Sequence, residues 1–292
     1  MAKQNPRSAN NTVSLITALQ NNPVWSPSLQ DAVTSVQSMR GDFKDYITRV
    51  FRRRQRHAIV TGAPGTGKSY TIAALAKIYG LREGTANDRG RYDYTVIKGN
   101  MSAAKLHAML YYHSKSGKIL ILDDCRNAEH DIECLTALNS AMDTTNPVVT
   151  RDRMSNLVDN DTIIPNQFKF AGSIIIVSNL FSTDRARMGS VKHTRYTSIM
   201  SRCQSFDFGS SDKQSIMANI LDLAENENLF ASASDKDVTE AFTWAVANLS
   251  QFKELSIRHM IEIMNLKTDP DLKDWRRLAR RVMLKTTDQI EV

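Results

Sequence analysis

The sequence contains few of the residues that hold together disulfide-rich folds or metal centres. Its 292 residues include three cysteines, at Cys125, Cys134 and Cys203, and no C-x-x-C pair. His130 lies between the first two, but these three side chains fall short of the four ligands that a structural zinc ion takes. Unpaired thiols are typical of a reducing compartment. We therefore expect neither a disulfide framework nor a structural zinc ion.

Long apolar segments are also missing. No run of about 18 apolar residues occurs, and the N-terminal MAKQNPRSANN lacks the apolar core of a signal peptide. These absences predict a soluble, cytoplasmic protein without a membrane partner. Hydrophobic residues make up 41% of the chain, which allows a substantial core, and the net charge of +7 is compatible with nucleic acid.

The order of apolar and polar segments predicts an α/β domain followed by a small helical one. Residues 1–25 are polar, and we expect them to be loosely ordered. Residues 26–56 show helical spacing in two runs and end in a basic cluster. Short apolar runs alternate with helical patterns over residues 57–210, which predicts a three-layer αβα domain with a parallel sheet. Residues 211–268 predict an all-helical lid, and residues 269–292 a basic C-terminal helix.

The motif GAPGTGKS gives the strongest chemical signal. It matches G-x-x-x-x-G-K-[ST] and lies between a predicted strand and a predicted helix, which is the setting of a P-loop. Its glycines let backbone N–H groups curve around phosphate oxygens, and the helix points its positive end at the same anion. We expect Lys68 to neutralise the β- and γ-phosphates of ATP, and Ser69 to ligate Mg²⁺. The predicted nucleotide-binding residues are Gly62, Ala63, Pro64, Gly65, Thr66, Gly67, Lys68, Ser69 and Tyr70.

Two further strand ends carry side chains that suit the same chemistry. The run ILILDDC ends in Asp123, which we expect to hold the magnesium, and Asp124, which we expect to polarise the attacking water. The run SIIIVSN ends in Asn179, whose amide could orient that water. A solvated strand end or a turn would also explain these residues. Their position after a P-loop favours the catalytic interpretation.

Three arginines are candidates for contacts to the γ-phosphate. Arg202, in TSIMSRCQSFDF, suits the transition-state charge of a phosphoryl group, and Arg195 is a nearby competitor. Arg258, in LSIRHM, begins a helix of the predicted lid and could reach back to the nucleotide. A surface arginine is the alternative for each.

These motifs and their order resemble the AAA+ ATPases over residues 26–268. The resemblance implies Walker A at residues 62–69, Walker B at Asp123 and Asp124, sensor 1 at Asn179, an arginine finger at Arg202 and sensor 2 at Arg258. It also implies a homo-oligomeric ring or spiral, because a finger acts on the ATP of a neighbour. The SRC motif is similar to the clamp-loader branch. The longer strand pattern is similar to AAA+ proteins of large tailed phages, which would place this protein in the host cytoplasm.

Two features depart from the AAA+ pattern. Walker B usually reads Asp-Glu, so the Asp124 carboxylate sits about 1.5 Å further back, one C–C bond length. A displacement of that size can cost about a hundredfold in rate. The segment KGNMSAAKL offers Met101 but no aromatic residue where protein-threading unfoldases carry a pore loop, which argues against threading of protein.

Basic clusters favour DNA as the substrate of a motor or loader in replication, recombination or packaging. They comprise Arg52, Arg53, Arg54 and Arg56, then Arg151 and Arg153, and finally Arg276, Arg277, Arg280 and Arg281. A solvated helix face would explain each cluster equally well. Three other functions remain open: a protein-remodelling or assembly ATPase that docks its partner through residues 143–167, a slow ATP-dependent switch, and a superfamily-3 type helicase. The predicted lid argues against the helicase.

Overall fold

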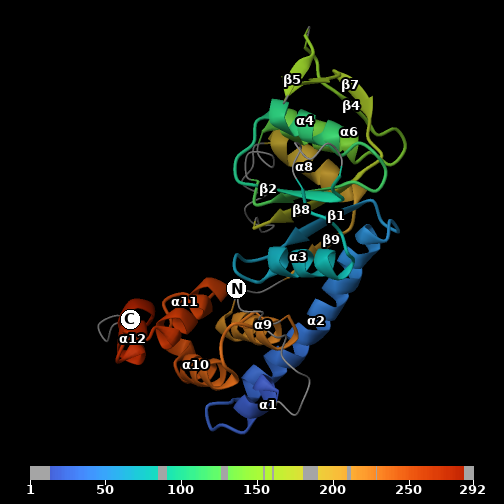
Figure 1. Ribbon diagram of the computed structural model, residues 1–292. Helices are drawn as coiled ribbons and strands as arrows, with labels where there is room; N and C mark the ends of the chain where they lie inside the picture. Colours follow the sequence, from blue (N-terminus) through green and yellow to red (C-terminus); the bar gives the residue numbers. More distant parts are fainter. Residues whose placement is uncertain are drawn as a thin grey trace. The chain divides into compact units, whose positions relative to one another are not determined.

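The computed structural model describes residues 14–84, 91–125, 131–153, 155–159, 161–179, 190–208, 212–227 and 229–285. The chain forms two units (Figure 1). The sheet unit contains residues 42–63 and 68–209, and the helical unit contains residues 1–41, 64–67 and 210–292. Each unit has its own hydrophobic core.

A parallel sheet forms the centre of the sheet unit. Among the described residues its five strands are β1 (His57–Thr61), β2 (Tyr94–Lys98), β3 (Ile119–Asp123), β8 (Ser173–Ser178) and β9 (Ser205–Asp207). They lie in the order β2-β3-β8-β1-β9, and every neighbouring pair is parallel. Every residue of β1 and β8 is buried, because helices cover the sheet on both faces.

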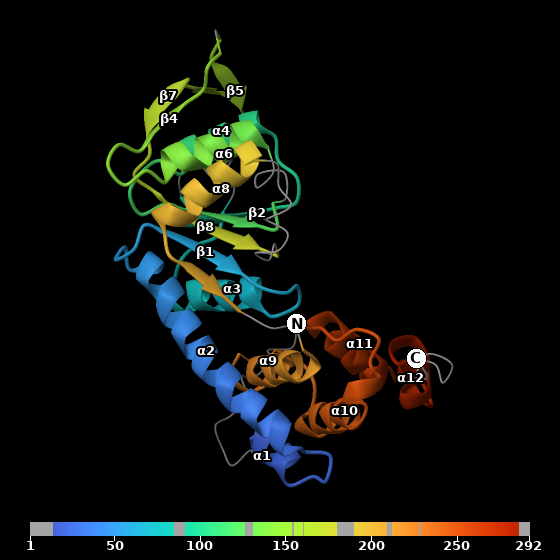
Figure 2. The ribbon, with the colours of Figure 1, turned by 180° about the vertical axis from the view of Figure 1, so that it is seen from behind.

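The covering helices lie in two layers. On one face lies α3 (Lys68–Ile78), and on the other lie α4 (Ala103–Tyr112), α6 (Ile132–Ala141) and α8 (Ser190–Arg202) (Figure 1 and Figure 2). The side chains of Ser102 and Asp131 cap α4 and α6 by accepting hydrogen bonds from first-turn N–H groups. The predicted three-layer αβα fold is confirmed.

Small antiparallel sheets form within and just after residues 143–167, the segment considered for docking a protein partner. β4 (Val148–Thr150) pairs with β7 (Gln167–Lys169), and β5 (Leu157–Asp159) pairs with β6 (Thr162–Ile164). Three-residue strands are too short to show a period of two, so the sequence pattern did not predict them. Met101, from the segment compared with pore loops, is buried in the core of the sheet unit.

Four capped helices build most of the helical unit. They are α9 (Lys213–Asn226), α10 (Asp235–Ala247), α11 (Ile257–Thr268) and α12 (Trp275–Met283), and a short 3₁₀ helix, η2 (Leu249–Gln251), follows α10. Each α-helix begins at a side chain that accepts a hydrogen bond from the first turn, namely Asp212, Ser234, Ser256 and Asp274. The predicted helical domain after the sheet is therefore confirmed. α12 packs into the same core through Trp275 and Ala279.

The N-terminal region differs from expectation. Helix α1 (Leu15–Gln20) buries Ile16 and Leu19 in the core of the helical unit, so the predicted loose order of residues 1–25 is wrong for this helix. Residues 1–13 lie outside the described residues. The two predicted runs form one helix, α2 (Pro27–Phe51), because helical hydrogen bonding continues through Gly41. No helix of the described ranges has the length and apolarity to cross a membrane.

Candidate nucleotide-binding site

The carboxyl ends of the central strands bring polar residues to one edge of the sheet. Asp123 at the end of β3 lies opposite Lys98 of β2 and Val177 of β8. Thr61, the last residue of β1, lies opposite Ser178 and also opposite Asp207 of β9. The residues that follow β1, β3 and β8 therefore emerge at the same edge, where ligands of open parallel sheets bind.

Lys68 is held in the middle of this edge. Its Nζ donates hydrogen bonds to the carbonyl oxygens of Gly62 (2.9 Å) and Ala63 (2.7 Å) and to Asn179 Oδ1 (3.1 Å). Burial lowers the pKa of the ammonium from 10.5 to about 8. Three carboxylates oppose that shift, those of Asp123, Asp124 and Asp207. At neutral pH Lys68 is thus mainly protonated and poised to exchange its carbonyl contacts for stronger anionic ones.

Ser69 and Asp123 form a pair of oxygen donors beside Lys68. Ser69 Oγ donates a hydrogen bond of 2.7 Å to Asp123 Oδ1. The Lys98 Nζ lies 3.6 Å from Asp123 Oδ2, but Lys98 is largely exposed and this ion pair is weak. A hydroxyl and a carboxylate at this spacing fit Mg²⁺, which prefers oxygen ligands and few protein ligands.

Two glycines of the loop before α3 have conformations in which other residues would be strained. Gly62 has φ +144°, and a side chain there would place its Cβ 2.7 Å from Phe208 Cβ. Gly65 has φ +77°, and its Cβ would lie 2.8 Å from Ser256 Cβ. The loop therefore needs glycine at both positions. Ser256 caps α11, so exposed Arg258, in the first turn of α11, begins close to the loop.

A buried arginine, which no sequence pattern singled out, also holds this loop. Arg40 is 1% exposed, and its Nη1 donates to the Thr66 carbonyl oxygen (3.4 Å). Its Nε lies 2.7 Å from Asp222 Oδ2 in an ion pair that lacks hydrogen-bond geometry, and its Nη2 lies 2.9 Å from Glu227 Oε1. A buried cation with two carboxylates thus fixes a carbonyl of the phosphate loop.

Two aspartates complete the surroundings of Lys68. Asp124 adopts a left-handed conformation, φ +53°, which aspartate tolerates better than most residues, and its N–H donates to the Val177 carbonyl oxygen (2.9 Å). Asp207, at the end of β9, was missed by the sequence reasoning. An acid that ends the strand beside β1 was the signal that could have found it. The catalytic role of Asp124 stays a prediction.

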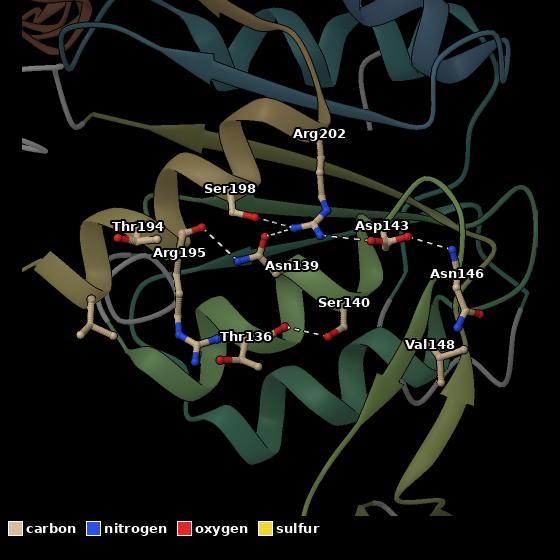
Figure 3. Close-up of a pocket in the computed structure, with 11 residues that line it drawn as sticks. Thr136, Asn139, Ser140, Asp143, Asn146, Val148, Thr194, Arg195, Ser198 and Arg202 are labelled. Carbon is tan, nitrogen blue, oxygen red and sulfur yellow. Dashed lines mark hydrogen bonds and ion pairs between the residues drawn. The ribbon is translucent and has the colours of Figure 1, made fainter.

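Arg202 lies in a separate pocket of about 620 Å³ between α6 and α8 (Figure 3). Its Nη1 donates to Asn139 Oδ1 and to Ser198 Oγ (2.7 Å), and its Nη2 lies 3.1 Å from Asp143 Oδ2. The N–H groups of Asn146 and Thr145, and then the Arg202 guanidinium, hold the pKa of the Asp143 carboxyl below its usual range.

Arg195, the competing finger candidate, lines the same pocket. Its carbonyl oxygen accepts a hydrogen bond from Asn139 Nδ2 (3.0 Å), so one asparagine contacts both arginines. The choice between Arg202 and Arg195 stays a prediction. The structure shows that both candidates occupy one pocket, apart from the residues that contact Lys68.

The fold neutralises part of the predicted basic clusters. Arg276 pairs with Glu240, and Arg153 lies 3.2 Å from Glu133. The four arginines of α12 are all exposed, namely Arg276, Arg277, Arg280 and Arg281. The surplus positive charge at α12 is therefore smaller than the sequence count suggests.

Cys125 and Cys134 are buried, and Cys203 is partly exposed. Burial raises the pKa of Cys134 to about 12 and that of Cys203 to about 12. Cys125 donates to the Ile97 carbonyl oxygen (3.2 Å). His130, the third residue considered for zinc, lies outside the described residues. Thiols with such high pKa values are poor metal ligands and poor nucleophiles.

The chain is similar to known proteins in sequence and in fold. No known protein-family profile matches it. It is 24% identical over 264 residues to an uncharacterized 36.7 kDa protein of the nrdC–mobD intergenic region of Enterobacteria phage T4, covering 84% of this chain and 77% of that protein.

Two of the solved structures that resemble the fold are bacterial. The RuvB Holliday junction branch migration motor of Thermotoga maritima is 13% identical with a TM-score of 0.41, over 84% of this chain and 68% of that one. NtrX of Brucella abortus in complex with ADP is 13% identical with a TM-score of 0.42, over 81% and 51%. These similarities are too low to assign the chain to a family.

Proposed function

We propose that the protein is an AAA+ ATPase that binds and hydrolyses ATP. One observation carries this proposal: a phosphate loop, a lysine, a hydroxyl–carboxylate pair and an amide meet at one edge of the sheet. The side chains are those of Lys68, Ser69, Asp123 and Asn179. A cluster with these contacts is what phosphoryl transfer requires, because its catalysis consists of positioning and charge stabilisation.

Each of these residues has a task in the proposed reaction. Lys68 would leave the loop carbonyls and donate to the β- and γ-phosphate oxygens. Ser69 and Asp123 would hold Mg²⁺, which when bound neutralises the charge that develops on the phosphates. Asp124 would accept the proton of the attacking water, and Asn179 would orient that water.

We also propose that the protein works as an oligomer. Arg202 contacts its own pocket rather than Lys68 or Asp123, so it is available to a site on another subunit. An arginine supplied in trans stabilises the transition-state charge and is worth about 10³–10⁵ in turnover. Arg258 would act as sensor 2 from the first turn of α11.

DNA is the substrate that we propose. The net charge of +7 and the exposed arginines of α12 support contacts to phosphates without base specificity. The similarity to a phage T4 protein supports a phage-encoded origin and a place in the host cytoplasm.

The protein-remodelling alternative has one observation in its favour. Val158 of β5 and Ile163 of β6 lie opposite each other, and each is 64% exposed. An exposed apolar pair at the end of a hairpin suits a protein partner better than DNA. Stimulation of the ATPase by DNA or by a candidate protein would decide between them.

The test of the ATPase is turnover of Mg²⁺–ATP against protein concentration, with and without DNA. We expect slow turnover when the protein is dilute and a rise on assembly. Lys68→Ala and Asp123→Asn should remove it, whereas Lys273→Ala, an exposed control on the segment before α12, should not. Tight ATP binding without turnover under every condition would replace the motor with a switch.

A further inference from the structure

A second pocket, of about 340 Å³, lies beside Arg202 in the sheet unit, and we call it the basic pocket. Its walls come from the end of α2, the start of β1, the turn after α6 and the end of α8. Four arginines line it, Arg49, Arg54, Arg56 and Arg202, together with neutral donors such as Gln55 and Thr144. None of the described lining residues is acidic.

The end of α2 explains why these arginines converge. The carbonyl oxygen of Arg49 accepts hydrogen bonds from the N–H groups of Arg54 (2.8 Å) and Gln55 (3.1 Å). Arg53 adopts the left-handed conformation, φ +59°, that ends many helices. The chain therefore turns back on itself, and residues 49 and 54 open onto the same pocket.

The four guanidinium groups are not equally engaged. Arg56 donates to the carbonyl oxygens of Phe170 (2.9 Å) and Asp143 (3.5 Å), and burial lowers its pKa. The ion pairs of described residues involve other arginines, Arg40, Arg82, Arg153, Arg202 and Arg276. Arg49 and Arg54 are exposed, and neither forms an ion pair with a carboxylate of the described residues.

The pocket consequently holds an excess of positive charge. His57, which also lines it, adds none, because burial and then the neighbouring Arg56 lower its pKa to about 3. Guanidinium groups that face one another repel unless an anion lies between them. Their planar donors match the oxygens of phosphate, and the nearby amide and hydroxyl groups can donate as well.

We propose that this pocket binds a phosphate of a nucleic-acid backbone. The proposal rests on DNA being the substrate and names where its backbone is held. A volume of about 340 Å³ accommodates one phosphate and its sugar. A flexible single strand can bend a phosphate into such a concave site. A duplex, with a persistence length of about 50 nm, presents its phosphates on a stiff rod. Single strands should therefore bind better.

Arg202 connects this pocket to ATP hydrolysis. It lines both the basic pocket and the pocket in which Asp143 holds it. A phosphate in the basic pocket would compete with Asp143 for the same guanidinium. Nucleic acid would thereby change the availability of the finger without touching Lys68.

The test is fluorescence anisotropy of a labelled single-stranded oligothymidylate, titrated with full-length protein at several salt concentrations. The variant Arg49→Gln/Arg54→Gln is compared with Arg280→Gln/Arg281→Gln, which removes the same charge from α12. We expect the pocket variant to weaken binding more than the α12 variant. Its slope of log affinity against log salt should become shallower by about 0.7, the value for the one phosphate contact that the pocket provides. Arg49→Lys/Arg54→Lys should restore most of the slope.

Each alternative outcome has a distinct meaning. Equal losses in the two double variants would indicate general charge and overturn the pocket. A loss confined to the α12 variant would also overturn it, while DNA remained the substrate. Absence of oligonucleotide binding by the wild-type protein at any salt concentration would overturn both the pocket and the DNA proposal. ATP affinity, measured in parallel, should be unchanged in both variants, so a failure of the ATPase proposal appears separately.

Discussion

Lys68 and Arg202 are two cations of the same unit that are held in opposite ways. Backbone carbonyls of residues five and six positions earlier hold Lys68, together with Asn179. Side chains from α6, the turn after it and α8 hold Arg202, which stays 27% exposed. The lysine is thus prepared within its own loop. The arginine is held by side chains that it could leave, as the role proposed for it at another subunit requires.

Lys68 gives the site a response to pH. Burial brings the pKa of Lys68 to about 8, within the working range of an assay. Nucleotide binding should therefore depend on pH through Lys68.

The largest expected effect is the loss of turnover when the Arg202 side chain is removed. Arg202→Ala should lower turnover of the assembled protein by about 10³, the lower end for an arginine finger. It should leave the nucleotide affinity of dilute protein unchanged. Arg195→Ala, from the same pocket, should lower turnover by less than about tenfold. Steady-state turnover at high protein concentration is the measurement, and a larger loss in Arg195→Ala would transfer the role to that residue.

The next effect concerns Arg40, a third cation, which contacts Thr66 within the helical unit. Arg40→Met should lower the free energy of unfolding by about 3–5 kcal/mol, because the buried carboxylates of Asp222 and Glu227 would lose their cation. Arg276→Met, which removes a half-exposed partner of Glu240, should cost less than about 1 kcal/mol. Urea unfolding compares them, and similar costs would show that the Arg40 network contributes no more than a surface pair.

The pH dependence of nucleotide affinity tests the lowered pKa of Lys68. Phosphate binds the ammonium form, and the free protein has a pKa lowered to about 8. Affinity should therefore be level below that pH and fall above it by up to about tenfold per pH unit. A lysine at its ordinary value of 10.5 would keep its affinity through pH 9. The measurement is a titration of a fluorescent ATP analogue between about pH 6.5 and about pH 9.5, a range that includes the lowered pKa of Lys68. A level profile would contradict the buried, depressed lysine.

The smallest effect concerns the ion pair that stores Arg202. Asp143→Asn keeps the shape of the side chain but weakens its attraction for the guanidinium. Turnover at a given protein concentration should then rise by about two- to fivefold, which corresponds to the free energy of an exposed ion pair. Activation is measured as turnover against protein concentration. A decrease would show that Asp143 positions the finger for attack rather than restraining it.

Much of the candidate nucleotide-binding site could be predicted because its parts are local. The P-loop is one continuous stretch, and Asp123 and Asn179 directly follow strands whose apolar runs are plain in the sequence. Parallel pairing then brings strand ends together by geometry alone. The helices of the helical unit were equally accessible, because their apolar residues recur at helical spacing.

The parts that could not be predicted depend on residues distant in sequence. Arg40 meets carboxylates more than 180 positions away, and its sequence neighbours give no sign of burial. Asp207 belongs to a three-residue strand, too short for a pattern. Helix α1 is ordered because Ile16 and Leu19 find an apolar core, although the segment around them is polar.

The sequence by itself determined the alternation of the longer strands and helices, the glycine-rich loop before α3 and the acids at the end of β3, because spacing along the chain sets each of them. The tertiary structure alone decided which side chains hold Lys68, Arg40 and Arg202, and it gathered four arginines into one pocket. Burial and charge pairing depend on neighbours in space, and those neighbours exist only once the layers have packed.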